Sequence, residues 1–179
     1  MMGGHKKNGK IRFRPVTTML ISIAAVLAVL WIIVSAQADG LRSKSNAMTV
    51  GSQAPDFTAT TTSGLPASLS AYRGKIVLIN FWASYCTPCV REMPLIHQLL
   101  QSRNSEIASL FINIGETKGT VRAFMEEHQF AFPVIIDTTG KISKQYGIIG
   151  LPATFIIDEN GNISKIVQGE VQGAASLLS

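Results

Sequence analysis

The sequence predicts an α/β domain with a mixed central sheet flanked by helices, preceded by one transmembrane helix. Two observations lead to this prediction. Strand-length apolar runs alternate with helical stretches, and the chain closes with two strands around a tight turn, an order typical of α/β layers. A 19-residue segment near the N-terminus, 16–34, carries no charge. The 179 residues suffice for one domain and an appendage.

The N-terminal segment has the length and flanks of a membrane anchor. A helix over 16–34 would be roughly 28 Å long, close to the hydrocarbon thickness of a bilayer. The five charges before it are all basic, namely Lys6, Lys7, Lys10, Arg12 and Arg14. This bias predicts a cytoplasmic tail at 1–15, a signal-anchor at 16–34 and a domain outside the cell membrane. Ala36-Gln37-Ala38 leaves an alternative open, a signal peptide cleaved after Ala38.

The net charge is explained by this tail. The chain has 16 Lys and Arg against 11 Asp and Glu, a formal charge of +5. From Asp39 onward the count is 11 of each sign, so the exported part is neutral. No basic patch is left to predict a nucleic-acid partner, and we expect a monomer.

The remainder divides into a polar linker at 35–49 and a domain at 50–179. Near-continuous apolar runs, as in strands buried on both faces, lie at 75–82, 107–114, 132–136, 153–157 and 163–167. Helical stretches lie at 88–102, 120–128 and 141–146. Asn160-Gly161 favours a tight turn between the last two strands. Residues 51–71 are rich in Thr, Ser and Pro and suggest a short hairpin, and any helix after Val167 would be short.

Cys86 and Cys89 are the only cysteines, two residues apart, and three interpretations are open. A structural clip would stabilise little, because so small a loop saves little chain entropy. A zinc site needs four ligands, and neither His97 nor His128 has ligand spacing, while His5 lies across the membrane. We therefore expect no metal and no cofactor.

The third interpretation, a redox couple, is favoured by placement. The pair lies where a buried strand ends and a helix begins, so Cys86 would be near the N-cap and Cys89 inside the first turn. The partial positive charge there stabilises a thiolate, the form that attacks disulfides. Pro88 costs no hydrogen bond at this position. Cys89 would then resolve the mixed disulfide.

The segment Trp82-Ala83-Ser84-Tyr85-Cys86-Thr87-Pro88-Cys89 resembles the active site of the thioredoxin superfamily. Its surroundings resemble the membrane-tethered TlpA/ResA-like thiol-disulfide oxidoreductases. The matching pieces are Gly51-x-x-Ala54-Pro55-Asp56-Phe57, Asn80-Phe81-Trp82-Ala83, Arg91-Glu92-Met93-Pro94, Tyr146-Gly147-Ile148 and Leu151-Pro152-Ala153-Thr154-Phe155-Ile156-Ile157-Asp158.

The resemblance implies a thioredoxin-like fold with an added N-terminal hairpin and a strand–helix insertion after the active-site helix. It implies that Pro152 is a cis-proline facing the cysteines and, with Leu151, part of the substrate-binding surface together with Pro88. Trp82 resembles the family tryptophan beside the redox pair, and we assign it to that surface too. A turn proline at 152 and a plain core tryptophan at 82 remain alternatives.

One departure concerns proton transfer. Thioredoxins carry a buried aspartate two residues before the tryptophan, and here that position is Asn80, which is no general base. Glu92 lies three residues after Cys89, on the same helix face. We hypothesise that Glu92 is partly buried, has a raised pKa and exchanges a proton with Cys89. An exposed glutamate in an early helical turn is the alternative.

The resemblance implies reduction of disulfides in exported proteins, first apocytochrome c, with electrons from a CcdA-type membrane thiol carrier. Alternatives are a reductant for spore-envelope or copper-site assembly proteins, and a copper chaperone. A peroxiredoxin-like peroxidase shares the Gly-x-x-Ala-Pro-Asp-Phe start. It would need a Pro-x-x-x-Thr-x-x-Cys pattern, and this chain has Ile79 and Ala83 at the Pro and Thr places.

Overall fold

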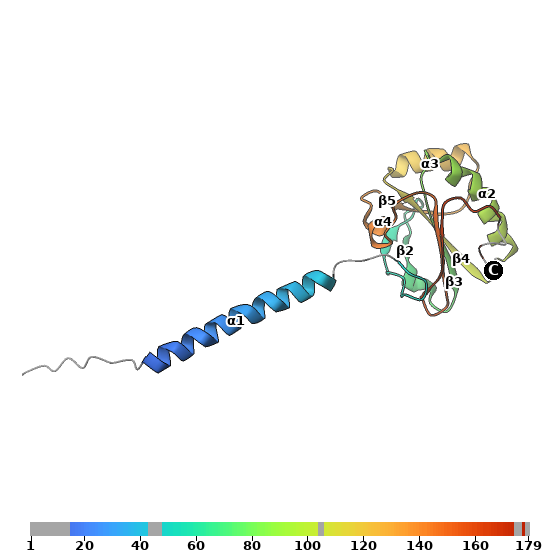
Figure 1. Cartoon of the computed structure of the whole chain (residues 1–179). Helices are drawn as coiled ribbons and strands as arrows, with labels where there is room; N and C mark the ends of the chain where they lie inside the picture. Colours follow the sequence, from blue (N-terminus) through green and yellow to red (C-terminus); the bar gives the residue numbers. More distant parts are fainter. Residues whose placement is uncertain (1–14, 43–47, 104–105, 174–176, 178–179) are drawn as a thin grey trace, which may run out of the picture. The chain divides into compact units, whose positions relative to one another are not determined.

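The computed structural model describes residues 15–42, 48–103, 106–173 and 177. The chain divides into two compact units, Met1–Ser45 and Asn46–Ser179. In the first unit, helix α1 spans Pro15–Arg42 (Figure 1). It therefore continues into the predicted linker 35–49, whose remaining part from 43 to 47 lies outside the described residues.

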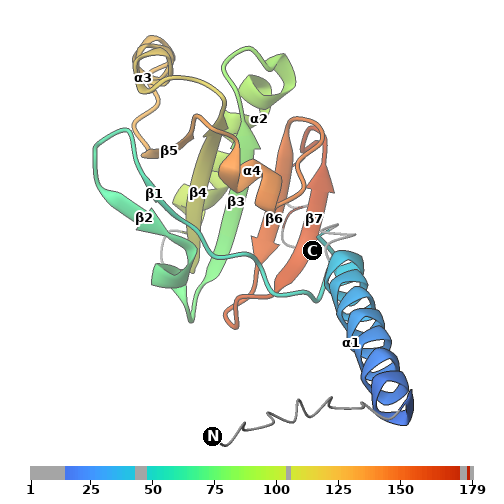
Figure 2. The ribbon, with the colours of Figure 1, turned by 90° about the vertical axis from the view of Figure 1, so that its left-hand side faces the viewer.

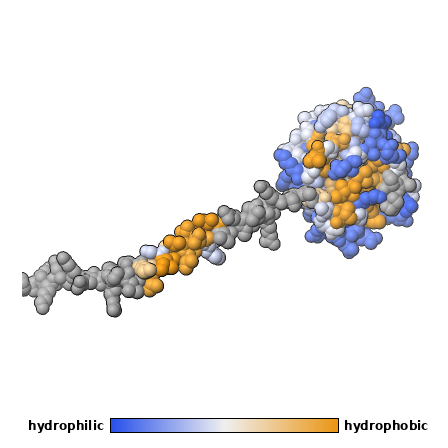
Figure 3. Space-filling model, viewed as in Figure 1, coloured by the Kyte–Doolittle hydropathy of each residue, from blue (hydrophilic) through white to orange (hydrophobic). Residues whose placement is uncertain are grey.

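The described side chains of α1, from Met19 to Ile33, are all exposed, and their surface is hydrophobic (Figure 3). Among the described residues, no helix has both the length and the apolar character needed to cross a membrane. The anchor at 16–34 stays a prediction.

The second unit contains a five-stranded mixed sheet in the order β5-β4-β3-β6-β7. Three strands run parallel, β3 (Ile76–Trp82), β4 (Ile107–Ile114) and β5 (Val134–Asp137). Antiparallel to β3 is β6 (Ala153–Ile157), which pairs with β7 (Ile163–Gln168) through the predicted tight turn. The expected mixed α/β architecture is confirmed (Figure 2).

The helices follow the predicted order with small shifts. They are α2 (Thr87–Ser102), α3 (Lys118–Glu127) and α4 (Lys141–Gln145). Helix α3 begins two residues earlier than predicted because the Thr117 hydroxyl caps it, accepting a hydrogen bond from the Thr120 N–H at 3.2 Å. Strand β5 begins after Pro133, which has no N–H for the sheet. Helix α3 and strand β5 provide the insertion expected after the active-site helix.

The predicted N-terminal hairpin is confirmed. Strands β1 (Thr58–Thr60) and β2 (Pro66–Ser68) pair antiparallel, and the 3₁₀ turn η1 (Leu69–Tyr72) leads from them to β3. The hairpin lies beside β5, since Thr61 forms an isolated bridge with Ile135 (Figure 2). Residues 169–173 after β7 are not helical, and the rest of any closing helix falls on 174–179, where only 177 is described.

Strand β3 separates two hydrophobic cores, because its side chains alternate between the faces of the sheet. Leu78 and Trp82 join the core that includes both cysteines and the buried side of α2. Val77, Ile79 and Phe81 join the other core, which includes α4 and the segment before β1. The functional residues therefore rest on a strand buried on both sides, which holds its end in a fixed position.

Candidate active site

The cysteines lie where β3 gives way to α2. Strand β3 ends at Trp82 and α2 begins at Thr87 with Cys86 as its N-cap, as predicted. The Cys86 Sγ accepts a hydrogen bond from the Cys89 N–H at 3.3 Å. The two residues form a disulfide with an S–S distance of 1.99 Å. Pro88 lies in the first turn of the helix, where its missing N–H leaves no bond unmade.

The two sulfurs differ in access. Cys86 is 9% exposed and Cys89 is completely buried. Only Cys86 can therefore meet a partner's sulfur, while Cys89 lies within the core and can attack only Cys86. This asymmetry matches the expected division into an attacking and a resolving cysteine.

The predicted cis-proline is present. The Leu151–Pro152 peptide bond is cis. Ala153, the next residue, pairs with Phe81 of β3, so Pro152 lies at the same end of the sheet as the cysteine turn. Pro152 is buried and Leu151 is half-buried. Their contact with substrate stays a prediction.

Trp82 lies behind the disulfide. Its side chain is completely buried in the core that contains both cysteines, and its ring packs on Phe124 at 5.4 Å between centroids. It therefore has no surface to offer a substrate in this structure, which favours packing against the redox pair over the direct binding we expected. Two exposed apolar side chains that we did not predict, Tyr85 and Ile149, precede Cys86 and Pro152 instead.

Glu92 is more deeply placed than predicted. Its side chain is completely buried, so the expectation of partial burial and the exposed alternative are both wrong. Oε1 accepts a hydrogen bond from Asn80 Nδ2 at 2.8 Å, and Oε2 accepts one from the Val171 N–H at 2.7 Å. Asn80 Nδ2 also donates to the Thr154 hydroxyl at 2.9 Å. The carboxyl thus joins α2, two central strands and the segment after β7.

Burial sets the acidity of this group. Removal from water raises the pKa of Glu92 above its ordinary value of 4.5, and the hydrogen bonds from Val171 and Asn80 oppose part of that rise. The negative charge of Glu170, which forms an ion pair with Arg91 at 2.6 Å, raises the pKa of Glu92 further. The predicted direction is confirmed.

Four further residues of the site escaped the sequence analysis. Thr154 and Val171 hold Glu92 and Asn80, and Glu116 with Asn113 holds the turn before Cys86. Thr154 and Asn113 left a signal, since each is a polar residue in a mainly apolar strand, at the end nearest the site. Val171 acts through its backbone, which carries no sequence signal.

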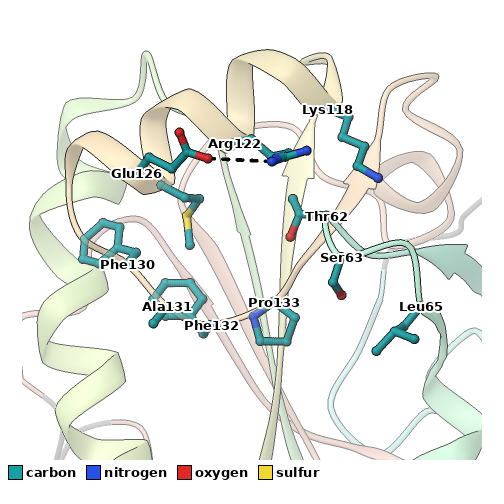
Figure 4. Close-up of a pocket in the computed structure, with 11 residues that line it drawn as sticks. Thr62, Ser63, Leu65, Lys118, Arg122, Glu126, Phe130, Ala131, Phe132 and Pro133 are labelled. Atoms are coloured by element: carbon teal, nitrogen blue, oxygen red, sulfur yellow. Dashed lines mark ion pairs between the residues drawn. The ribbon is translucent and has the colours of Figure 1, made fainter.

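Two open hollows lie on either side of α3. The first, about 830 Å³, reaches the residues that flank Cys86. It is lined by Ser84, Thr87, Val90, Arg91, Pro94, Phe124, Glu127, His128 and Phe130. The second, about 710 Å³, lies between α3 and the hairpin loop, where Lys118 and Arg122 extend above Thr62 and Ser63 (Figure 4). It shares only Phe130 with the first and includes no residue of the cysteine turn.

Within the described parts of the chain, no three His, Cys, Asp or Glu side chains lie close enough together to hold a metal ion.

Comparison with known proteins identifies relatives of the second unit. Residues 50–166 match the AhpC/TSA family. A thiol-disulfide oxidoreductase ResA of Geobacillus thermodenitrificans is 42% identical over 71% of this chain and 74% of its own. A ResA of Bacillus cereus is 33% identical over 92% and 91%. A thiol:disulfide interchange protein of the thioredoxin family from Chlorobium tepidum superposes with a TM-score of 0.64 at 28% identity, over 73% of this chain and 94% of its own.

Proposed function

Because this chain belongs to the AhpC/TSA family and is a thiol-disulfide oxidoreductase related to the ResA proteins, we propose that it reduces disulfide bonds in exported proteins, apocytochrome c first among them. The observation that supports the proposal best is the unequal access of the two sulfurs, 9% for Cys86 and none for Cys89. A pair arranged in this way can take a disulfide from a partner and then release that partner.

The reaction proceeds in two exchanges. The Cys86 thiolate attacks one sulfur of the substrate disulfide, forming a mixed disulfide and releasing one substrate thiolate. Cys89 then loses its proton and attacks the Cys86 sulfur, which releases the second substrate thiolate. Two electrons pass to the substrate, and the Cys86–Cys89 pair becomes the disulfide seen here.

Glu92 is the group we assign to the proton of Cys89. It lies one helical turn after Cys89, it is buried, and its raised pKa lets it hold a proton closer to neutral pH than an exposed glutamate could. The Glu92→Gln variant keeps the shape and removes the titrating group. We expect slower release of the mixed disulfide and an altered Cys89 pKa, and unchanged thiol pKa values with unchanged exchange rates would refute the role.

We place the reaction on the outer side of the cell membrane. The uncharged segment 16–34 and the five basic residues before it support a single-pass anchor with the domain outside. Outside the cytoplasm no thiol buffer recharges the pair. The proposal therefore includes a CcdA-type membrane thiol carrier as electron donor.

The reduction potential of the Cys86–Cys89 pair tests the direction of electron flow. A reductant should have a potential well below that of the oxidising machinery of its compartment, near that of thioredoxin, at about −270 mV. The potential is measured by equilibrating the domain with glutathione or dithiothreitol buffers. A potential near that of a strong oxidant, about −120 mV, would overturn the direction assigned here.

Substrate identity is tested by trapping. A Cys89→Ser variant cannot resolve the mixed disulfide, so Cys86 should remain bound to its substrate, and Cys86→Ser is the matched control that should trap nothing. With purified partners, the reduced domain should reduce an oxidised Cys-x-x-Cys-His peptide faster than a disulfide peptide of scrambled sequence. Equal rates would remove apocytochrome c as the preferred substrate while leaving the reductase activity intact.

Family membership keeps a peroxidase as the second candidate, since the match is to the AhpC/TSA family. The residues Ile79 and Ala83, at the places where a peroxidase needs Pro and Thr, favour the reductase. Thiol-dependent consumption of hydrogen peroxide at a rate comparable with disulfide exchange would reverse that order. Tight Cu(I) binding by the reduced pair with little exchange activity would instead favour a copper chaperone.

A further inference from the structure

A second carboxylate, Glu116, binds the turn that leads to Cys86. Its Oε2 accepts a hydrogen bond from the Ser84 N–H at 2.7 Å, and its Oε1 accepts one from the Ser84 hydroxyl. Oε2 also accepts a hydrogen bond from Asn113 Nδ2 at 2.6 Å. One side chain therefore meets three donors, two from Ser84 in a loop 32 residues away and one from Asn113 near the end of β4.

The segment that carries Glu116, residues 113–117, is itself held in place. Asn113 is completely buried at the end of β4, where it pairs in register with Trp82 of β3. The Gly115 N–H donates to the Asp137 carbonyl at 3.1 Å, and Thr117 caps α3. Glu116 thus extends from a segment that is fixed before and after it. Its hydrogen bonds with Ser84 fix the neighbouring loop relative to that segment.

The turn that it holds carries the attacking cysteine. The Cys86 N–H donates to the Ala83 carbonyl at 3.2 Å, so Ser84 lies within the turn that ends at Cys86. In the oxidised protein the disulfide itself fixes the Cys86 sulfur. Once the disulfide is reduced, the sulfur depends on this turn and on the Cys89 N–H to stay at the positive end of α2.

We propose that Glu116 is a positioning residue, whose contacts with Ser84 hold the turn so that the reduced Cys86 sulfur remains at the N-terminus of α2. The inference rests on the proposed function, since it concerns the thiolate that this function uses. The inference adds a residue to that function. Among the contacts described, Glu116 touches neither sulfur, and it acts through Ser84.

Two physical effects of Glu116 have opposite signs, and this makes the proposal testable. Its contacts favour the thiolate by keeping the sulfur at the helix end. Its negative charge, by contrast, disfavours a second negative charge nearby. If contacts dominate, losing them makes Cys86 less reactive, whereas if charge dominates, losing it makes Cys86 more reactive.

Two substitutions separate these effects. Glu116→Asp keeps the charge but is one methylene shorter and cannot reach all three donors. Glu116→Gln removes the charge but keeps the reach, because its amide oxygen can accept from both N–H groups while the Ser84 hydroxyl turns to accept from its amide nitrogen. The exposed Glu159→Asp, in the turn after β6, is the matched control for shortening a glutamate.

The measurement is the rate at which iodoacetamide alkylates the reduced full-length protein at pH 7, together with the reduction potential of the pair. Because Cys89 is buried, the fast phase reports Cys86. We expect Glu116→Asp to slow this phase about tenfold, the scale of a small misplacement, and to make the potential more negative since the thiolate form is destabilised. The alkylation rate of Glu116→Gln should stay within about twofold of that of the original protein, because its hydrogen bonds are exchanged for others of similar strength.

Three outcomes overturn the proposal. Faster alkylation of Glu116→Gln with an unaffected Glu116→Asp would mean that charge dominates. If alkylation slows equally in Glu116→Asp and Glu116→Gln, the contacts alone do not position the sulfur and the charge is required as well. If alkylation changes in neither variant, Glu116 has no role at Cys86. If Glu116→Asp does not fold, as judged by circular dichroism, Ser84→Ala removes one of the three contacts and should slow alkylation in the same direction.

The proposed function can fail separately. Alkylation needs no substrate, so the Glu116 comparison stands even if the reduction potential shows the protein to be an oxidant. If the unsubstituted protein exchanges disulfides as proposed but both Glu116 variants match it, only the positioning role is lost.

Discussion

Strand β3 contributes side chains to both faces of the central sheet, but the two faces differ in how these side chains are packed. On the α4 side, Phe81 packs between Tyr146 and Phe155, with ring centroids 5.3 and 5.8 Å away. The Tyr146 hydroxyl donates to the Pro55 carbonyl at 2.8 Å, and the buried Asp137 carboxylate accepts from the N–H groups of Ile142 and Ser143 in α4. On the α2 side, the neighbouring residue Asn80 faces Glu92 in a buried hydrogen-bonded cluster beside the cysteines.

This difference separates stability from reactivity. Apolar burial on the α4 side is favourable for every side chain that joins it. Burial of a carboxyl on the α2 side costs free energy unless hydrogen bonds offset it, and here Asn80 and Val171 provide them. Substitution of an apolar residue on the α4 side should therefore change stability alone, whereas substitution in the cluster around Glu92 should change stability, pH dependence and redox chemistry together.

The largest expected effect is on the apolar side. Phe81→Ala removes a completely buried ring and should lower the free energy of unfolding by about 3–5 kcal/mol. Urea denaturation of the oxidised protein measures this loss. The reduction potential of the surviving folded fraction should be unchanged, because Phe81 belongs to the core without cysteines. A clear change in potential would show that the two faces are coupled.

The next effect is on the polar side. Asn80→Asp places a second carboxyl against Glu92 Oε1, in place of a donor now 2.8 Å away. Two buried carboxyls this close cannot both ionise, and keeping them together in the folded protein costs about 2–4 kcal/mol near neutral pH. Both carboxyls are protonated in acid, so the loss should shrink as the pH falls.

Denaturation at pH 5 and pH 8 measures this dependence. Asn80→Ala is the control, since it removes the donor without adding a charge, and its loss of stability should change less between pH 5 and pH 8 than that of Asn80→Asp. An Asn80→Asp loss that is as large at pH 5 as at pH 8 would contradict the assigned cause.

The same contrast explains what the sequence could predict. The strands of both cores were identified from local patterns, because the residues at 76–82 are apolar on both faces of the sheet, with Asn80 as the exception. The redox pair and the cis-proline were identified from a motif of contiguous residues, with Cys86 at the predicted N-cap. Local sequence therefore sufficed for the apolar framework and for the sulfurs.

The polar contacts around the sulfurs could not be predicted, because their partners are distant in sequence. The full burial of Glu92 depends on Val171, 79 residues away, and the role of Glu116 depends on Ser84. Side chains of β3 alternate between the two faces of the sheet, and this alternation places Trp82 in the core on the α2 side. It therefore does not face the surface where we expected substrate to bind. The membrane anchor, also local in sequence, stays a prediction.

A smaller effect concerns Glu92 itself. Its folded pKa is raised above its ordinary value, so the stability linked to it is present below pH 4.5 and is lost as the pH rises through the folded pKa. Glu92→Gln does not titrate, so its stability relative to that of the original protein should rise as the pH rises through that window. Thermal unfolding from pH 4 to pH 8 measures the difference. A constant difference over this range would mean that the pKa of Glu92 is the same in the folded and unfolded protein, which would contradict the assigned effect of burial.

The smallest expected effect lies at the surface of the same cluster. Glu170 is held by Arg91 through two hydrogen bonds, at 2.9 and 2.6 Å, and this pairing lowers the pKa of Glu170. Its charge is the last of the causes that raise the pKa of Glu92. Glu170→Gln should therefore move the Glu92-linked transition to slightly lower pH with little change in Tm, as expected for an exposed pair.

The matched control is Glu106→Gln, which breaks the exposed Arg103–Glu106 pair at the other end of α2. In thermal unfolding from pH 4 to pH 8, this control should leave the Glu92-linked transition at the same pH. If both variants move the transition equally, the effect is one of net charge, and the connection from Glu170 to Glu92 is not specific. A shift confined to Glu170→Gln would show that a charge at the protein surface influences the buried Glu92. A binding partner could then alter the pKa of Glu92 by contacting Glu170.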